Sequence, residues 1–314
     1  MSAAEEPQAD IREMLNEMDA LPAPSSSKLS PEGARQFTKQ RFPLPDEPEP
    51  VGDVMDLLVP GPDEQVPVRV YVPDRDPPYP GLVYLHGGGW VTRDVDMYDP
   101  TCRAFVRESG CLVVAVEYRR APEHPFPAAL KDCYAAAEWT VVNAESFNMH
   151  PDAIAIGGDS AGGNLAAAIT QLARERDGPT FAHQMLIYPV TDYAFDTDSY
   201  RENADGYLLT KESMEWFWDH YLADDIHGAN PYASPLRASD LSGLPSATIV
   251  TCGFDPLRDE GVAYVERLQA AGVDVTHIHY EAAIHDVMTL RDPDITNAKQ
   301  RIEAVSQQLR TRLQ

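Results

Sequence analysis

The chain has 314 residues, of which 43% are apolar, so it is long and apolar enough to bury a substantial core. Its 50 acidic residues against 25 basic ones give a formal net charge of −25, which repels nucleic acid and anionic membrane surfaces. We therefore expect neither as a partner. Chains of this size often form one core with an insertion, so we expect one main domain with a small accessory layer.

The acidic excess also suggests an environment, because only five of the basic residues are Lys. A strongly hydrated acidic surface is used by proteins of salt-loving organisms. We hypothesise such a source, with folding that needs high salt to screen self-repulsion. An acidic protein from an ordinary source is the alternative.

The cysteines and the first residues bear on compartment and metal binding. Cys102, Cys111, Cys133 and Cys252 form no C-x-x-C pair and have no neighbouring His cluster, so we expect buried free thiols and no metal site. The first ten residues, MSAAEEPQAD, are acidic and lack the pattern of a secretory signal. No apolar run approaches the roughly 20 residues that span a bilayer. These features predict a soluble, cytoplasmic protein.

Residues 1–45 differ from the rest of the chain. Ile11, Met14, Leu15 and Met18 recur at helical spacing, and the Pro/Ser stretch LPAPSSS follows them. The pattern predicts an amphipathic helix and a linker, and the helix needs a surface on which to bury its apolar stripe. We expect this region to form the first part of a cap over the main domain; a weakly ordered arm is the alternative.

Residues 46–314 alternate between short β-rich runs and longer helical stretches, which predicts a mostly parallel sheet with helices on both faces. The predicted strands are 68–72, 82–85, 112–118, 153–156, 185–188, 247–252 and 275–280. The predicted helices are 127–144, 161–176, 257–271 and 294–313. Several of the strands are continuously apolar, as buried parallel strands are.

The alternation stops between about 190 and 240, where an acidic loop is followed by an aromatic helix with Thr210 as a good N-cap. We expect residues 190–240 to be an insertion in the main domain that folds over the site as the second part of the cap.

A candidate nucleophile lies where the predicted strand AIAI meets a predicted helix. The intervening residues, GGDSAGG at 157–163, contain G-x-S-x-G in a strand-turn-helix context. In this arrangement Ser160 lies on a strained turn with its hydroxyl exposed, and Gly158 and Gly162 let neighbouring backbone pass closely. The helix that begins behind Ser160 places a positive dipole end near developing negative charge.

A second motif, HGGGW at 86–90, directly follows the predicted strand 82–85. Three consecutive glycines leave backbone N–H groups unshielded, which suits the binding of a tetrahedral oxyanion. A purely structural glycine turn is the alternative. A phosphate-binding loop fits less well, because neither the P-loop spacing nor the dinucleotide spacing is present.

A serine hydroxyl needs a base to take its proton, and the base needs an orienting carboxylate. In folds built around this kind of turn, the carboxylate and then the His follow the serine, each after a later strand. Asp255 follows the predicted strand 247–252, and His285 follows the predicted strand 275–280. We therefore assign Ser160, His285 and Asp255 as nucleophile, base and orienting acid.

Other titratable residues compete for these roles. His277 and His279 share one face of a strand interior, remote from the strand end where sites form. Asp259 lies one helical turn beyond Asp255 and is expected to cap or decorate the following helix. Asp286 adjoins the chosen base but points elsewhere if His285 faces the serine.

At these motifs the sequence resembles the bacterial hormone-sensitive lipase family of α/β-hydrolases. The resemblance spans about residues 50–290 and rests on five elements in order, namely HGGGW at 86–90, EYRRAPEHPFPAAL at 117–130, GDSAGGNLA at 158–166, DPLRDEG at 255–261 and the His285 loop. It implies an α/β-hydrolase fold with a two-part helical cap. It also implies the same triad, with the backbone N–H groups of Gly88, Gly89 and Ala161 as the oxyanion hole.

The sequence departs from the family pattern at Arg120, where an apolar residue is usual, and at Asp286 and Val287, where a small or aromatic pair is commoner. The second departure concerns the wall of the substrate pocket. Aromatic residues of the cap, the glycine loop and a strand end, together with Leu208, are candidates to bound an acyl pocket closed to long chains, or else form the cap's own core. These candidates are Trp90, Tyr188, Tyr207, Leu208, Trp216, Phe217 and Trp218.

The expected activity is hydrolysis of short- to medium-chain acyl esters through an acyl-enzyme, a range that the resemblance implies. The expected partner is a small ester, and neither metal nor cofactor is required. An amidase or deacetylase with the same triad is one alternative. A hydrolase-like binding protein is another, although such receptors have lost the His that is present here. The oligomeric state stays open between monomer and homodimer.

Overall fold

The protein is built around one sheet, which we describe from a computed structural model covering residues 4–20, 26–289 and 298–314. Within these residues, eight strands pair in the order β1-β2-β4-β3-β5-β6-β7-β8. The strands are β1 (Asp53–Val59), β2 (Val66–Val72), β3 (Tyr79–Leu85), β4 (Leu112–Val116), β5 (Met149–Asp159), β6 (His183–Ile187), β7 (Ser246–Phe254) and β8 (Val275–Ile284). All seven predicted strands are present.

Strand direction divides the sheet into two parts. Strands β3 to β8 run parallel to one another, whereas β1 and β2 form an antiparallel edge. The parallel strands therefore end at one edge of the molecule, where sites of α/β folds form. β1 was not predicted because its apolar residues do not alternate with polar ones, as they do in a typical half-buried strand.

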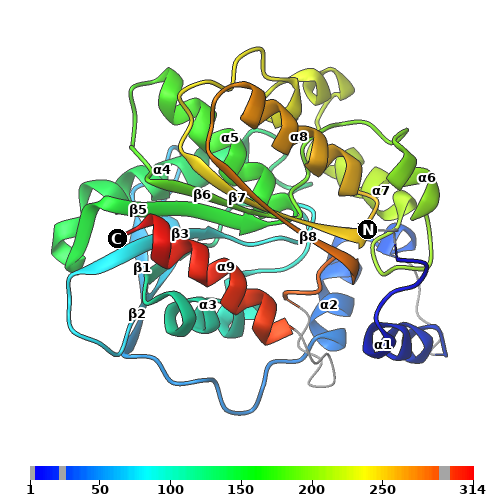
Figure 1. Cartoon of the computed structure of the whole chain (residues 1–314), viewed down its shortest axis with the longest axis horizontal. Coiled ribbons are helices and arrows are strands. Elements are labelled where there is room, and N and C mark those ends of the chain that lie inside the picture. Colours follow the sequence, from blue (N-terminus) through cyan, green and yellow to red (C-terminus); the bar gives the residue numbers. More distant parts are fainter. Residues whose placement is uncertain (1–3, 21–25, 290–297) are drawn as a thin grey trace.

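Helices cover both faces of the sheet, as expected for an α/β-hydrolase fold (Figure 1). The helices of the described part are α1 (Ala9–Ala20), α2 (Pro31–Arg41), α3 (Val95–Ser109), α4 (Ala128–Val142), α5 (Ala161–Glu175), α6 (Asp198–Glu202), α7 (Lys211–Tyr221), α8 (Arg258–Ala270) and α9 (Ala298–Arg312). Short 3₁₀ helices lie at Ser26–Lys28, Ala144–Phe147, Asp225–Ala229 and Pro235–Arg237. In Figure 1, α4, α5 and α8 lie on one face, and α3 packs against α9 on the other.

Most helix predictions agree with the structure. α4, α5 and α8 match three predicted helices within about two residues, and α9 matches the described part of the fourth, whose residues 294–297 lie outside the described chain. α2, α3 and the short α6 were missed. α2 begins after Ser30, whose side chain caps it, with Pro31 at its first position. α3 contains Pro100, a residue that predicts a break.

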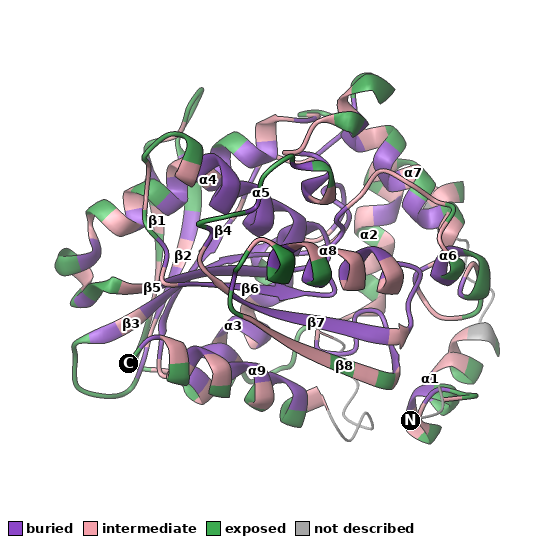
Figure 2. Ribbon diagram, turned by 45° about the horizontal axis from the view of Figure 1, so that its top comes forward, coloured by how far each residue is buried: buried purple, intermediate pink, exposed green. Residues whose placement is uncertain are grey.

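The core lies on both faces of the sheet, between the strands and the inner sides of the helices (Figure 2). β4 and β6 are buried throughout, and β8, at the far edge, is only half-buried along most of its length. α5 follows β5 and is buried at nearly every position. The strand that carries the candidate nucleophile and the helix behind it are therefore held rigidly on all sides.

The N-terminal helices lie with the inserted segment at the side of the molecule toward which the parallel strands run (Figure 1). Ile11 and Met14 of α1 are buried, as the apolar stripe predicted. The backbone N–H of Gln8 donates to the carbonyl of Ala282 at 2.9 Å, which ties the start of α1 to β8. Thr210 caps α7 by accepting from the N–H of Ser213, as predicted.

Two further sequence-based expectations have structural outcomes. All four cysteines are buried, as expected. Burial raises the pKa of the Cys111 thiol to about 11, so that thiol is unreactive at neutral pH. Among the described helices, none has the length and apolar character needed to cross a membrane.

Candidate active site

Ser160 occupies a sharp turn between β5 and α5. Its backbone has φ 54° and ψ −119°, a strained conformation for a residue with a side chain. The Ser160 N–H donates to the carbonyl of Ile187 on the neighbouring strand at 2.9 Å, and the Ser160 carbonyl accepts from the N–H of Asn164 at 3.0 Å. The turn is therefore held from both sides.

The glycines on either side of Ser160 permit a close approach of backbone. A Cβ atom on Gly162 would lie 1.9 Å from the carbonyl oxygen of Leu85, and one on Gly158 would lie 2.3 Å from the same oxygen. Leu85 ends β3, which passes directly beside the turn. The reason given for these two glycines from the sequence is confirmed.

Ser160, His285 and Asp255 form one chain of hydrogen bonds. Nε2 of His285 lies 3.0 Å from Oγ of Ser160, and Nδ1 of His285 lies 2.7 Å from Oδ2 of Asp255. Because a carboxylate can only accept, Nδ1 carries the proton and Nε2 is free to take the serine proton. The other oxygen of Asp255 accepts the N–H of Leu257 at 2.9 Å, which fixes the orientation of the carboxylate.

Burial and charge act in opposite directions on the base. Burial lowers the pKa of His285, but the charge of Asp255, its hydrogen bond and the charge of Asp286 together outweigh burial, so the pKa is raised above the ordinary value of 6.5. All three side chains are buried. The buried carboxylate thus stabilises the imidazolium that forms when His285 takes a proton.

Gly88 and Gly89 lie in the loop between β3 and α3, with φ +107° and +59°. Among the described residues, none accepts a hydrogen bond from the N–H of Gly88 or Gly89. Ala161 is the first residue of α5, where helix amides have no acceptor within the helix. The arrangement can bind an anion beside Ser160, so the oxyanion hole of these three residues remains our proposal.

The fold and this geometry agree with comparisons to known proteins. A family model described as alpha/beta hydrolase fold matches residues 82–289. The chain belongs to the α/β-hydrolase family. The match includes the turn at Ser160, the loop at Gly88 and Gly89, and both other members of the chain of hydrogen bonds.

Individual relatives in this family are esterases and a deacetylase by name. The carboxylic ester hydrolase LipN of Mycobacterium tuberculosis is 45% identical over 76% of this chain and 65% of its own length, slightly under two thirds. Arylacetamide deacetylase of Bos taurus is 35% identical over 71% of this chain and 72% of its own. A thermostable esterase of Pseudomonas putida has a TM-score of 0.91 with 32% identity, covering 100% of this chain and 99% of the other. The relatives support the assignment to the hormone-sensitive lipase branch.

Two of the hydrolase's aromatic pocket candidates lie beside the reacting groups. The ring of Tyr188 is 4.6 Å from that of His285. The ring of Phe217 covers Gly89, since a Cβ there would lie 2.2 Å from a ring carbon. A role for these two residues in bounding the substrate remains our proposal.

Most of the other candidates pack against further aromatic rings. Trp90 is fully buried and stacks on Tyr221 at 4.0 Å, with Trp218 at 4.7 Å. The ring of Tyr207 lies 5.0 Å from that of Phe254, and Leu208 follows with φ 71°. Both Tyr207 and Leu208 are half-buried. That these remaining candidates contact the substrate therefore stays a prediction from the sequence.

The competing titratable residues lie outside the triad. Nε2 of His277 and Nδ1 of His279 both lie 2.8 Å from Oγ1 of Thr251, which confirms that they share a strand face. Asp259 lies in the first turn of α8, where it accepts from the N–H of Ser199. Within the described residues, no group of three or more His, Cys, Asp and Glu is arranged to hold a metal ion.

Sequence reasoning missed Asp159, which directly precedes the nucleophile. Its carboxyl group accepts from the hydroxyls of Tyr84 and Tyr98, at 2.8 and 2.5 Å, and from the N–H of Gly87 at 3.1 Å. Burial raises the pKa of Asp159 to about 6. The residue ties the glycine loop to the turn of Ser160. Its signal in the sequence was an acid at the end of an apolar strand.

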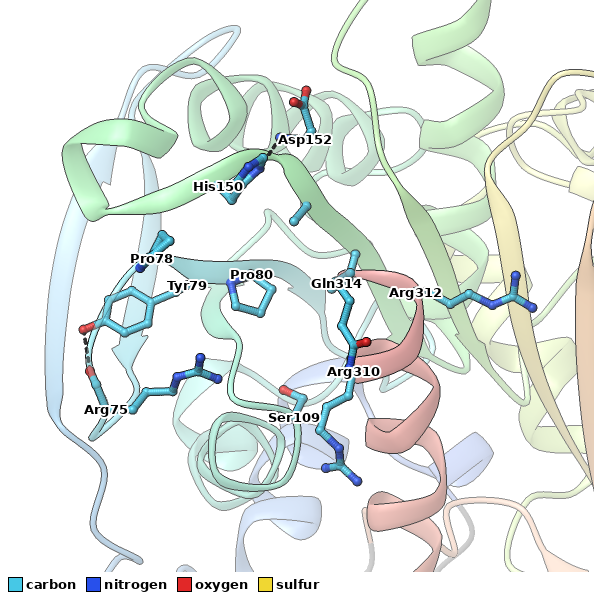
Figure 3. Close-up of a pocket in the computed structure, with 12 residues that line it drawn as sticks. Arg75, Pro78, Tyr79, Pro80, Ser109, His150, Asp152, Arg310, Arg312 and Gln314 are labelled. Carbon is cyan, nitrogen blue, oxygen red and sulfur yellow. Dashed lines mark hydrogen bonds between the residues drawn. The ribbon is translucent and has the colours of Figure 1, made fainter.

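A hollow of 460 Å³ lies at the opposite end of the sheet, around the starts of β3 and β5 and the end of α9 (Figure 3). It contains a serine and a histidine, but Oγ of Ser109 donates to the carbonyl of Phe105, and His150 lies on the far wall. Its Arg310 lies in the last turn of α9, where helix carbonyls favour a cation. The hollow therefore has no nucleophile paired with a base.

Proposed function

We propose that this hydrolase cleaves short- to medium-chain carboxylic esters through a covalent acyl-enzyme. The observation that carries the proposal is the buried chain of hydrogen bonds from Asp255 through His285 to Ser160. A serine hydroxyl in this arrangement is activated for attack on an acyl carbon. The esterase names of the relatives support the same activity.

The reaction proceeds in two steps. His285 takes the proton of Ser160 as Oγ attacks the ester carbonyl, and the N–H groups of Gly88, Gly89 and Ala161 bind the oxyanion. The ester C–O bond breaks as His285 returns the proton to the departing alcohol. His285 then takes a proton from water as the water oxygen attacks the acyl carbon. The bond between that carbon and Oγ breaks, Oγ takes the proton back from His285, and the carboxylic acid leaves.

We assign the acyl-binding space to the region bounded by Tyr188 and Phe217. Tyr188 lies against His285, and Phe217 covers the oxyanion loop, so both limit the space around the acyl carbon. Residues 1–45 and 190–240 supply the cap above it. The supporting observation is that α1, α2, α6 and α7 gather at the side where the parallel strands end (Figure 1).

The test is burst kinetics on a chromogenic ester series of increasing acyl length, with Ser160→Ala measured alongside. We expect a burst equal to the enzyme concentration, activity concentrated at short and medium chains, and labelling of Ser160 by a fluorophosphonate. Undiminished turnover by Ser160→Ala would end the proposal. Absence of both labelling and turnover would favour a binding protein.

Amide hydrolysis is the second candidate, favoured by the similarity to arylacetamide deacetylase. The triad and oxyanion hole serve acyl transfer from nitrogen as well as from oxygen. An ester and its matching anilide, assayed in parallel at equal concentration, separate the two. A higher kcat/KM on the anilide would assign the amidase function.

We further propose that the net charge of −25 reflects a salt-rich cytoplasm. At low ionic strength such a charge destabilises the compact state by self-repulsion. Added salt shortens the range of that repulsion and restores stability.

A further inference from the structure

The loop 88–94, which begins with the oxyanion glycines, is fastened to its surroundings by arginine side chains. Arg35 of α2 donates from Nε to a carbonyl of the loop at 2.8 Å. Arg120, one of the departures from the family pattern, donates from Nη1 to two further loop carbonyls at 3.0 and 2.8 Å. The backbone that presents the oxyanion N–H groups is therefore held from two sides.

The loop's own arginine, Arg93, reaches the loop that carries the catalytic base. Its Nη1 donates to Oδ1 of Asp286 at 3.0 Å, and its Nη2 contacts Oδ2 of the same carboxylate, so the pair is bidentate. Each side chain is only 12% exposed. Asp286 is the residue after His285 and the second departure from the family pattern, and its backbone has φ 67°.

The contact continues from Arg93 to the nucleophile. Nη1 of Arg93 also donates to the hydroxyl of Tyr98 at 3.0 Å, and that hydroxyl donates to Oδ2 of Asp159 at 2.5 Å. Asp159 immediately precedes Ser160. One buried polar chain thus joins the His285 loop, the oxyanion loop and the nucleophile turn.

A buried ion pair adds little to the free energy of unfolding. Removing two charges from water carries a penalty that their mutual attraction often only balances, and apolar residues of similar size are frequently as stable. A planar guanidinium bound by two oxygens does, however, fix distance and direction. The pair is therefore better suited to positioning than to stability.

We propose that Arg93 and Asp286 are positioning residues for ester hydrolysis, holding the His285 loop in register with the oxyanion loop while their opposite charges cancel at the imidazole. The inference rests on the proposed esterase function and deepens it. Arg93 approaches from the loop after β3 and Asp286 from the loop after β8, so the pair acts across two separate segments.

Because their charges are opposite, Arg93 and Asp286 act on the pKa of His285 in opposite directions, which uncharged packing residues would not do. The groups that act on the imidazole are Asp255 after β7, Asp286 beside it, Arg93 opposite, the hydroxyl of Ser160 and the ring of Tyr188. Asp286 raises the pKa of His285, and Arg93 lowers it. Loss of one partner leaves the other's charge uncompensated.

The experiment compares Arg93→Gln, Asp286→Asn, their double variant and Arg93→Lys with the wild-type chain. Arg103→Gln is the matched control, because Arg103 pairs with Asp99 at 2.8 Å with similar exposure, 14% and 17%, away from the triad. Fluorophosphonate titration counts active sites in each sample, and kcat, KM and the pH profile of kcat/KM are measured on one ester.

We expect kcat to fall about 10- to 100-fold in each single variant with KM little changed, since small misplacements near the chemistry can cost about 10²-fold. The acidic limb of the profile moves to higher pH in Arg93→Gln and to lower pH in Asp286→Asn. In the double variant the limb returns toward the wild-type position, while kcat stays low and falls no further than in the worse single variant.

Arg93→Lys keeps the charge but loses the bidentate fork, so we expect a wild-type acidic limb with a reduced kcat. We expect the control variant Arg103→Gln to keep both the wild-type acidic limb and the wild-type kcat. Unchanged kcat in both single variants, or limbs that move in the same direction or not at all, would overturn the inference while wild-type turnover still upholds the esterase function. A wild-type chain that neither labels nor hydrolyses esters would refute both.

Discussion

Nε2 of His285 lies 3.0 Å from Oγ of Ser160, although 125 residues separate the two in the chain. The two residues follow β8 and β5, and the intervening strands β6 and β7 fix the distance between those strand ends. A small displacement of either loop breaks the contact. Activity is therefore sensitive to groups that orient these loops as well as to the reacting groups.

Asp255→Asn should lower kcat by roughly 10⁴, with little change in KM, because the amide favours the wrong tautomer of His285. The matched control is Asp259→Asn, whose carboxylate pairs with Arg258 and contacts none of the triad. Steady-state kinetics on one ester, with circular dichroism to verify folding, provides the measurement. A loss below tenfold in Asp255→Asn would contradict the role of this residue.

Gly89→Ala should reduce kcat by roughly 10²- to 10³-fold, the usual effect of losing an oxyanion donor. A Cβ at this position meets the ring of Phe217 at 2.2 Å, and φ is +59°. Gly206→Ala is the control, because Gly206 also has a left-handed φ, +90°, but open space around it. Adding Phe217→Ala to Gly89→Ala should restore part of the activity. Equal losses in both glycine variants would show backbone strain alone.

The acidic limb of kcat/KM should have its midpoint above pH 6.5, since the pKa of His285 is raised and only the neutral imidazole accepts a proton. The raised pKa also favours the folded state. That contribution is complete below the unfolded pKa of His and is lost as pH rises through the folded pKa. A kinetic pH profile from 5 to 9 tests the first point; a midpoint below 6.5 would contradict it.

Asp159→Asn should alter how stability depends on pH. Burial raises the pKa of Asp159 from 3.8 to about 6, so the folded state binds this proton more tightly than the unfolded state. The stabilisation is present below pH 3.8 and is lost as pH rises through about 6. Relative to the variant, the free energy of unfolding of the wild-type chain should fall by at most roughly 3 kcal/mol as the pH rises across this window.

Denaturant unfolding of both chains at intervals between pH 4 and 7 gives the difference directly. The groups shared by the two chains cancel in the comparison. A stability difference that does not change with pH would mean that Asp159 has the same proton affinity in both states.

The melting temperature should rise from low to molar KCl, because the screening length falls from about 10 Å at 0.1 M to about 3 Å at 1 M. Neutralising exposed acids should reduce that rise by lowering the net charge of −25. The exposed positions chosen for a combined variant are Asp46→Asn, Glu47→Gln, Glu138→Gln and Glu145→Gln. A flat or falling melting temperature in the wild-type chain would refute the proposed adaptation to salt.

Local patterns were sufficient to predict much of this protein. Short apolar runs that alternate with helical stretches predicted seven strands, and the G-x-S-x-G turn placed Ser160 at the end of one of them. Chain order then selected Asp255 and His285 from many acids and nine His residues. β1 escaped because its apolar residues do not alternate with polar ones, and α3 escaped because Pro100 inside it predicts a break in a helix.

The sequence by itself determined the sheet, the turn of Ser160 and the order of the triad, because these depend on neighbouring residues and on the ends of consecutive strands. Only the tertiary structure decided that Arg93 meets Asp286, that Tyr98 meets Asp159, and that Phe217 covers Gly89. Arg93 and Asp286 are 193 residues apart. Contacts between such distant segments arise from packing and leave no local pattern in the chain.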